Sequence, residues 1–234
     1  MRRILPTLTA VVLLAFAASP AAFAADVWGG PPNDTWNRGD PGSTWQHWDF
    51  CDPVVHTPCE GQNEYGTPGF EFEEPGAWQW VAELPPLDPG DTQSYPIDGW
   101  QFNGPAGSTG TLILHIPNRP RPNEEKLIFL QITSSKGPSG VTALGFDSAA
   151  GGTGYTSGTW PTGKPQIQHP NGWYTYNYGL SIRPNPEFED IVIDVPAGTI
   201  IDQIVVDTIC TPEPATLSFL AIGGLAVLRK RRKQ

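Results

Sequence analysis

Glycine and proline divide this sequence into short segments. The 234-residue chain contains 26 glycines and 26 prolines, and both residues disfavour the interior of a helix. Between its two ends the chain lacks the sustained i, i+3, i+4 apolar repeat of an amphipathic helix. Short apolar runs bounded by glycine and proline are typical of strands. Because aromatic residues make up 11% of the chain, more than a disordered chain carries, the sequence predicts an all-β domain.

The clearest expected strand is 125–134, EKLIFLQITS. It is apolar on both faces at its centre, which is typical of the interior of a sandwich. Segments 110–117 and 173–182 alternate between apolar or aromatic and polar residues. The other expected strands are 44–50, 70–73, 78–84, 97–102, 141–146, 188–195 and 200–209. With long irregular connections, these strands predict a single β-sandwich of jelly-roll type, flanked by an N-terminal signal helix and a short hydrophobic C-terminal helix.

The N-terminus has the layout of a secretory signal peptide. Arg2 and Arg3 precede an apolar run at 8–18, and the small-residue stretch AAFAA follows a proline. This order of charge, apolar region and cleavage site predicts removal of residues 1–25, with the cut after Ala24 or Ala25. The alternative is a retained membrane helix, which the run disfavours because a span needs about 20 apolar residues.

Residues 211–234, TPEPATLSFLAIGGLAVLRKRRKQ, form a second terminal segment. Its apolar part, 215–228, predicts a short transmembrane helix. Five basic residues follow at once: Arg229, Lys230, Arg231, Arg232 and Lys233. A basic cluster beside an apolar segment stays on the cytoplasmic side, so the rest of the chain is expected outside. The simplest alternative is a plain single-pass anchor.

This tail resembles the PEP-CTERM sorting signal. The motif Pro212, Glu213 and Pro214, the apolar helix and the basic end occur in that order within about a tenth of the chain. The resemblance implies recognition by an exosortase, a membrane cysteine transpeptidase of bacteria that also make exopolysaccharide. It implies transient anchoring in the inner membrane, removal of the tail and delivery to the envelope surface or extracellular matrix. Segments 38–50 and 201–210 also resemble uncharacterised secreted proteins with the same tail, and this likeness implies no activity.

The body of the chain, 26–210, is expected to be one strongly acidic domain. Between residues 26 and 214, seven basic residues face 24 acidic ones, a net charge of −17. Nucleic acid is therefore excluded as a partner, because phosphate binding needs lysine and arginine. Neutral sugars and cations remain compatible with this charge.

The three cysteines predict one local disulfide. Cys51 and Cys59 are separated by seven residues in an exported chain, which makes a bridge between them the expected pairing. The sequence leaves open whether Cys210 pairs between chains, competes for the other two or keeps its thiol. His47 and His56 lie near the pair, but the spacing matches no zinc motif, so no metal ligands are predicted.

No residue is predicted to be catalytic. The chain lacks a G-x-S-x-G nucleophile motif, and His115 is expected to be a surface or hydrogen-bonded residue of a strand. Acidic pairs such as Glu71 and Glu73 could in principle serve a glycan hydrolase, but they are more simply a solvated strand face. A structural Ca²⁺ at the turn Asp88-Pro89-Gly90-Asp91 is the one cofactor left open.

Tryptophan gives the remaining functional signal. The chain has nine tryptophans, and exposed rings of this kind stack on sugars. Trp160, in a glycine-rich loop, and Trp173 are the expected exposed rings, whereas the tryptophans of the predicted strands are expected inside. We therefore expect an exported, non-catalytic envelope or matrix protein, with exosortase as processing partner and exopolysaccharide as candidate ligand. The alternatives are a carbohydrate-binding module and, third, a glycan hydrolase.

Overall fold

The computed structural model describes residues 36–50, 53–84, 97–119, 124–146, 155–156, 158–159, 167–169 and 172–212. The predicted signal peptide, Cys51, the Asp88–Asp91 turn, Trp160 and the tail beyond Pro212 lie outside these residues. The described strands are β1 (Ser43–Trp48), β2 (Glu60–Gln62), β3 (Gly69–Phe72), β4 (Trp78–Leu84), β5 (Ile97–Phe102), β6 (Thr109–Pro117), β7 (Glu124–Ser134), β8 (Gly140–Phe146), β9 (Tyr155–Thr156), β10 (Gly158–Thr159), β11 (Ile167–Gln168), β12 (Tyr174–Ile182), β13 (Phe188–Pro196) and β14 (Ile200–Pro212). Apart from these strands, the described part has only the short 3-10 turn η2 (Pro75–Ala77), which confirms the all-β prediction.

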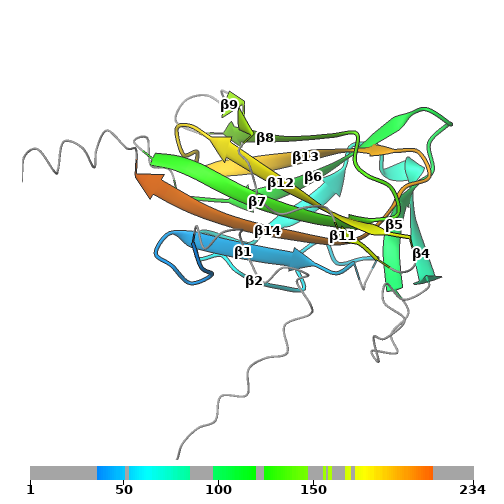
Figure 1. Cartoon of the computed structure of the whole chain (residues 1–234), viewed down its shortest axis with the longest axis horizontal. Coiled ribbons are helices and arrows are strands. Elements are labelled where there is room, and N and C mark those ends of the chain that lie inside the picture. The colour runs from blue at the N-terminus through cyan, green and yellow to red at the C-terminus, as the bar shows by residue number, and fades with distance from the viewer. Residues whose placement is uncertain are drawn as a thin grey trace, which may run out of the picture.

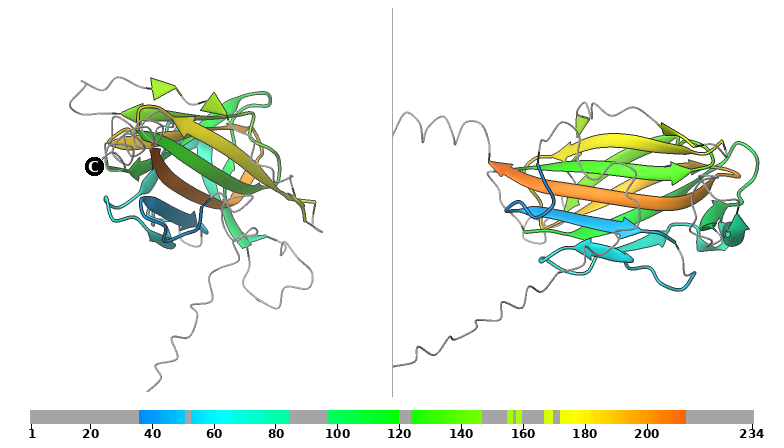
Figure 2. Two further views of the ribbon diagram at one scale, coloured as in Figure 1. Left: turned by 60° about the vertical axis from the view of Figure 1, so that its left-hand side comes forward. Right: turned by 60° about the horizontal axis from the view of Figure 1, so that its bottom comes forward.

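The strands form two antiparallel sheets that lie face to face (Figures 1 and 2). The first sheet has the order β10-β12-β7-β14-β1-β2, with β11 on β12 and the β4-β5 hairpin attached to β14 through β5. The second sheet has the order β3-β6-β13-β8-β9. The chain therefore folds as a sandwich, as its alternating strands predict.

Alternation along the strands builds the core between the sheets. In β6 and β13 every second residue is buried, so one face of each strand is inside and the other faces outward. These strands contribute Leu112, Leu114, Ile116, Ile191, Ile193 and Val195 to the core, and the opposite sheet contributes Ile128, Leu130, Ile132, Ile201, Ile204 and Val206. Full burial of each such side chain stabilises the fold by roughly 1.5–3 kcal/mol.

β14 is the central strand of the first sheet and the longest of the described strands, with 13 residues. It pairs with β7 on one side and with β1 on the other. Its last pair joins Pro212 to Glu124 of β7. The folded body therefore reaches the first residue of the expected sorting motif.

A buried ion pair fixes the segment before β1 to β14. The Arg38 guanidinium donates two hydrogen bonds to Asp207, from Nε to Oδ1 at 2.5 Å and from Nη2 to Oδ2 at 2.8 Å. The Asp207 side chain is 0% exposed. Arg38 also lies 4.5 Å above the Trp45 ring, so its charge is held by both a carboxylate and an aromatic face.

Candidate functional site

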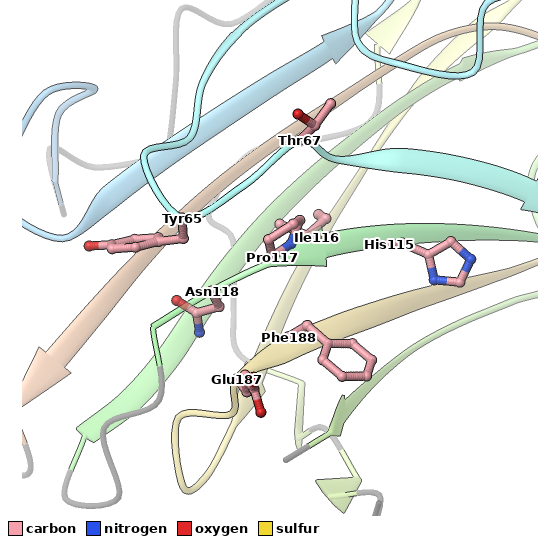
Figure 3. A pocket seen from close by; sticks show the side chains of 8 residues that line it. All are labelled: Tyr65, Thr67, His115, Ile116, Pro117, Asn118, Glu187 and Phe188. Atoms are coloured by element: carbon pink, nitrogen blue, oxygen red, sulfur yellow. The ribbon is translucent and has the colours of Figure 1, made fainter. Parts of the chain in front are cut away.

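A surface pocket of about 370 Å³ opens at the second sheet (Figure 3). Its lining residues are Tyr65, Thr67, His115, Ile116, Pro117, Asn118, Glu187 and Phe188. They come from the end of β6, the start of β13 and the loop after β2. The pocket thus combines strand residues, whose positions the sheet fixes, with one loop that covers them.

Two aromatic rings border the pocket. Phe188 is 37% exposed, because it occupies the outward-facing parity of β13, and its ring stacks on Phe146 with centroids 5.1 Å apart. Tyr65 is partly buried in the loop after β2, and its backbone N–H donates to the Asn63 side chain at 2.9 Å. Figure 3 shows Tyr65 to one side of Pro117 and Asn118, and Phe188 with His115 to the other. Such rings, with polar groups between them, suit the faces and hydroxyls of a sugar.

His115 lies between two carboxylates. Its Nδ1 is 2.7 Å from Asp190 Oδ1, and its Nε2 is 3.3 Å from Glu71 Oε1. Burial raises the pKa of Asp190, and the hydrogen bond from His115 opposes the rise. The expectation of a hydrogen-bonded surface histidine is confirmed. Among the described residues that line the pocket, Thr67 carries the one aliphatic hydroxyl group.

Trp173 does not offer the exposed ring that the sequence suggested. It is only 8% exposed, and it lies at the turn that leads into β12. In this turn His169 N–H donates to the Trp173 carbonyl at 2.8 Å, and Gly172 adopts the left-handed φ of 85°. The expected exposure of Trp173 is therefore wrong, and Trp160, the other candidate, lies outside the described residues.

The strand tryptophans are inside to different degrees. Trp48 and Trp78 are buried in the core, as expected, and Trp80 and Trp100 pack against it while partly exposed. Trp45 is partly exposed beneath Arg38. The acidic residues of the segment that includes β3 point to solvent, as the interpretation of Glu71 and Glu73 as a solvated face requires.

Four carboxyl groups near the end of β1 interact electrostatically: Asp49, Glu60, Asp98 and Asp202. Burial, followed by repulsion from Glu60 and Asp98, raises the pKa of Asp49 to about 6. Burial raises the pKa of Asp202 well above its usual value, and Asp49 and Asp98 add to the rise. Among the described residues, no group of three or more histidine, cysteine, aspartate or glutamate side chains could hold a metal ion. The calcium hypothesis at the Asp88–Asp91 turn stays a prediction, because that turn is not described.

The two histidines near the expected disulfide have structural contacts. His47 is buried and its Nε2 lies 2.7 Å from Gln203 Nε2, and His56 stacks on Phe70 at 4.5 Å. Cys59 is exposed. Since Cys51 is not among the described residues, the Cys51–Cys59 bridge remains a prediction.

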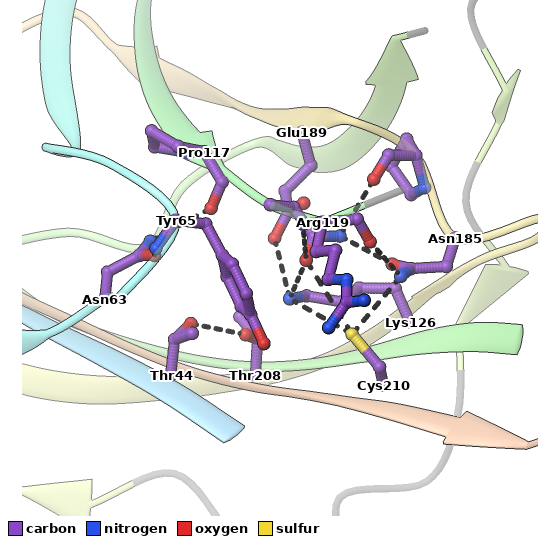
Figure 4. Close-up of polar contacts among 12 residues, drawn as sticks. Thr44, Asn63, Tyr65, Pro117, Arg119, Lys126, Asn185, Glu189, Thr208 and Cys210 are labelled. Atoms are coloured by element: carbon purple, nitrogen blue, oxygen red, sulfur yellow. Dashed lines mark hydrogen bonds and ion pairs between the residues drawn. The ribbon is translucent and has the colours of Figure 1, made fainter. Parts of the chain in front are cut away.

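A buried polar cluster escaped the sequence reasoning. Lys126, Glu189, Asn118, Asn185 and Cys210 meet between the sheets at one end of the core (Figure 4). Alternation along the strands is the sequence signal that points to this cluster. Lys126 on β7, Glu189 on β13 and Cys210 on β14 each occupy a position that faces inward in an otherwise apolar strand. Parity alone does not predict burial here, because charged side chains near strand ends usually reach solvent.

No protein-family model matches the chain, and no curated protein matches it. In the part of the chain that the structure describes, no helix is long and apolar enough to cross a membrane.

Proposed function

We propose that this protein is an exported, non-catalytic component of the cell envelope or extracellular matrix, delivered by a signal peptide and sorted by an exosortase through its C-terminal tail. The observation that carries the proposal is the end of β14 at Pro212. β14 ends at Pro212, the first residue of the Pro212-Glu213-Pro214 motif, so removal of the chain beyond Pro212 would leave every described strand in place. The tail would hold the chain in the inner membrane only until processing.

The strand order supports the jelly-roll type for the domain. The set β1-β14-β7-β12 in one sheet faces the set β6-β13-β8-β9 in the other. Along the chain these eight strands change sheet at every step except the β8-β9 hairpin, which is the connectivity of a jelly roll. The fold alone implies no function, but it suits a stable surface module.

The sorting proposal is tested in a bacterium that has an exosortase. Glu213→Ala and deletion of residues 229–233 should each leave unprocessed protein in the membrane fraction, while the body still folds. Glu64→Ala, at an exposed glutamate outside the tail, is the matched control and should be delivered normally. Normal processing of both tail variants would refute the proposal.

A second candidate function is binding of a neutral polysaccharide at the Tyr65–Phe188 pocket. The exposed Phe188 ring and the polar groups of His115 and Glu187 support it. Loss of one stacking ring should cost about 1 kcal/mol, or roughly fivefold in Kd.

Gel retardation in neutral polysaccharides measures this binding. Tyr65→Ala and Phe188→Ala should each weaken retardation of the protein. Val54→Ala, at an exposed apolar residue outside the pocket lining, should not. Absence of retardation for the unmodified protein, or equal retardation of all variants, would contradict a sugar site here.

A further inference from the structure

The inward-facing apolar rows of three strands run into polar residues at the same end of the sandwich. On β7 the row that contains Ile128 begins with Lys126, and on β13 the row that contains Ile191 begins with Glu189. Asn118 directly follows β6 with the same inward parity. Lys126 and Glu189 are both 0% exposed, and Asn118 is 6% exposed. An amine, a carboxyl group and a primary amide are thus shut away from water together.

The Asn118 amide is held beside the Lys126 amine. Lys126 Nζ lies 3.1 Å from Asn118 Oδ1 and 3.5 Å from Glu189 Oε1. The backbone N–H of Arg119 donates to the same Oδ1 at 2.8 Å. The Cys210 thiol is a third donor to Oδ1, at 3.7 Å. While Lys126 attacks Cγ, the Arg119 N–H and the Cys210 thiol can still polarise the Asn118 carbonyl.

The leaving side of the amide is oriented as well. Asn118 Nδ2 donates to Asn185 Oδ1 at 2.5 Å and to the Pro186 carbonyl at 3.0 Å. Asn185 is itself fixed, because its Nδ2 donates to the Arg119 carbonyl at 2.8 Å. The amide thus keeps one orientation, with Oδ1 toward Lys126 and Nδ2 away from it.

The unreacted cluster is a costly arrangement. Within the described part of the chain, neither carboxylate oxygen of Glu189 has a hydrogen-bond partner. Burial raises the pKa of Glu189 to about 7, although the Lys126 charge opposes the rise. A buried ion pair with incomplete hydrogen bonding often stabilises a fold less than a neutral replacement would. A reaction that removes both charges is therefore favoured by the surroundings.

We propose that Lys126 and Asn118 join in an intramolecular isopeptide bond, with Glu189 as the proton carrier. Lys126 first passes a proton from Nζ to the Glu189 carboxylate, and the neutral Nζ attacks Asn118 Cγ. The C–N bond forms while the carbonyl electron pair moves onto Oδ1, which accepts the Arg119 N–H.

Collapse of this intermediate restores the carbonyl and breaks the bond from Cγ to Nδ2. Glu189 gives its proton to Nδ2, which leaves as ammonia, and then takes a second proton from Nζ. Of the two protons that Nζ gives up, one leaves with ammonia and the other stays on Glu189. The products are a neutral secondary amide, a neutral carboxylic acid and ammonia, so no oxidant or other co-reactant is needed.

The bond would tie the two sheets together covalently. Asn118 follows β6 of the second sheet, and Lys126 belongs to β7 of the first, where it pairs with Cys210 of β14. The tie lies at the end of the sandwich where β14 leaves the fold. Unlike a disulfide, the isopeptide bond would resist reducing agents. The proposal for this bond is independent of the proposal for sorting.

Peptide mapping of the purified full-length chain tests the bond. Glu124 and Glu125 lie between Asn118 and Lys126 in the sequence, so a protease that cuts after glutamate should release two peptides that remain joined. Their joint mass should be lower by one ammonia, about 17 Da, than the sum of the separate peptides. Trypsin should also fail to cut after Lys126. Recovery of two separate peptides at full mass from the folded protein would overturn the proposal.

Variants assign the roles. Lys126→Arg, Asn118→Ala and Glu189→Gln should each yield separate peptides, with folding monitored by near-UV circular dichroism. Lys136→Arg, at an exposed lysine outside the cluster, is the matched control and should keep the joined peptides. If the bond persists in Asn118→Ala and disappears in Asn185→Ala, the acceptor is Asn185 and the assignment is wrong. A joined pair that Cys210→Ser separates would show a thiol-derived link instead.

Discussion

Three carboxyl groups with raised pKa values, the half-buried Asp49 and the buried Glu189 and Asp202, should make the protein more stable at mildly acidic than at alkaline pH. Burial raises the pKa of Asp49 from 3.8 to about 6 and that of Glu189 from 4.5 to about 7. The pKa of Asp202 is raised in the same direction. The folded state therefore binds these protons more tightly than the unfolded chain does.

The sign follows from proton linkage. Stabilisation by a group with a raised pKa is complete below its unfolded value and is lost as the pH rises through its folded value. Between pH 5 and pH 8, Asp49 should lower the free energy of unfolding by roughly 1–2 kcal/mol and Glu189 by roughly 2–3 kcal/mol. Together these two groups should lower the free energy of unfolding by about 3–5 kcal/mol, and Asp202 should add to this loss.

Urea unfolding followed by tryptophan fluorescence at pH 5, 6.5 and 8 measures this slope. Asp49→Asn and Asp202→Asn should each flatten it, because an amide does not titrate. Glu64→Gln, at an exposed position, should leave it unchanged. A free energy of unfolding that stays constant or increases from pH 5 to pH 8 would refute the reasoning.

Three further predictions concern packing and covalent structure. Arg38→Ala removes the guanidinium that pairs with the buried Asp207, and it should lower the free energy of unfolding by about 3 kcal/mol in urea titration. A loss below about 1 kcal/mol would show that the ion pair contributes no more than an exposed ion pair does. Leu114→Ala opens a cavity at a fully buried core position and should lower the free energy of unfolding by roughly 3 kcal/mol in the same assay. An unchanged urea midpoint would contradict this prediction. Reduction of a Cys210→Ser protein should raise its mass by about 2 Da if Cys51 and Cys59 are bridged, and no change would rule out the bridge.

Most long strands could be predicted from the sequence because alternation leaves a local signal. Strands β6 and β13 bury every second residue, and their partners repeat the same period. The short strands β2, β9, β10 and β11 were not predicted. They have only two or three residues each, too few to show a period, and exist because a neighbouring strand offers hydrogen bonds.

The pocket and the buried cluster depend on contacts between distant segments. Phe188 and Tyr65 line the same pocket only when β13 and the loop after β2 pack side by side in the folded chain. No local sequence pattern predicts that these two segments are neighbours. In the sequence, Lys126 and Glu189 occupy positions that alternation places on the inward faces of their strands. That they contact each other follows only from the packing of the two sheets face to face. The burial of Trp173 likewise depends on tertiary packing, which the local sequence does not show.

The mature protein recovered from the producing cell tests the central proposal most directly. Mass spectrometry of the protein purified from the envelope and culture medium should find a chain that begins at Asp26 or near it and lacks Arg229 to Lys233. Such a result would show export and removal of the tail together. Recovery of the intact chain from Met1 to Gln234, confined to the cytoplasm, would contradict it.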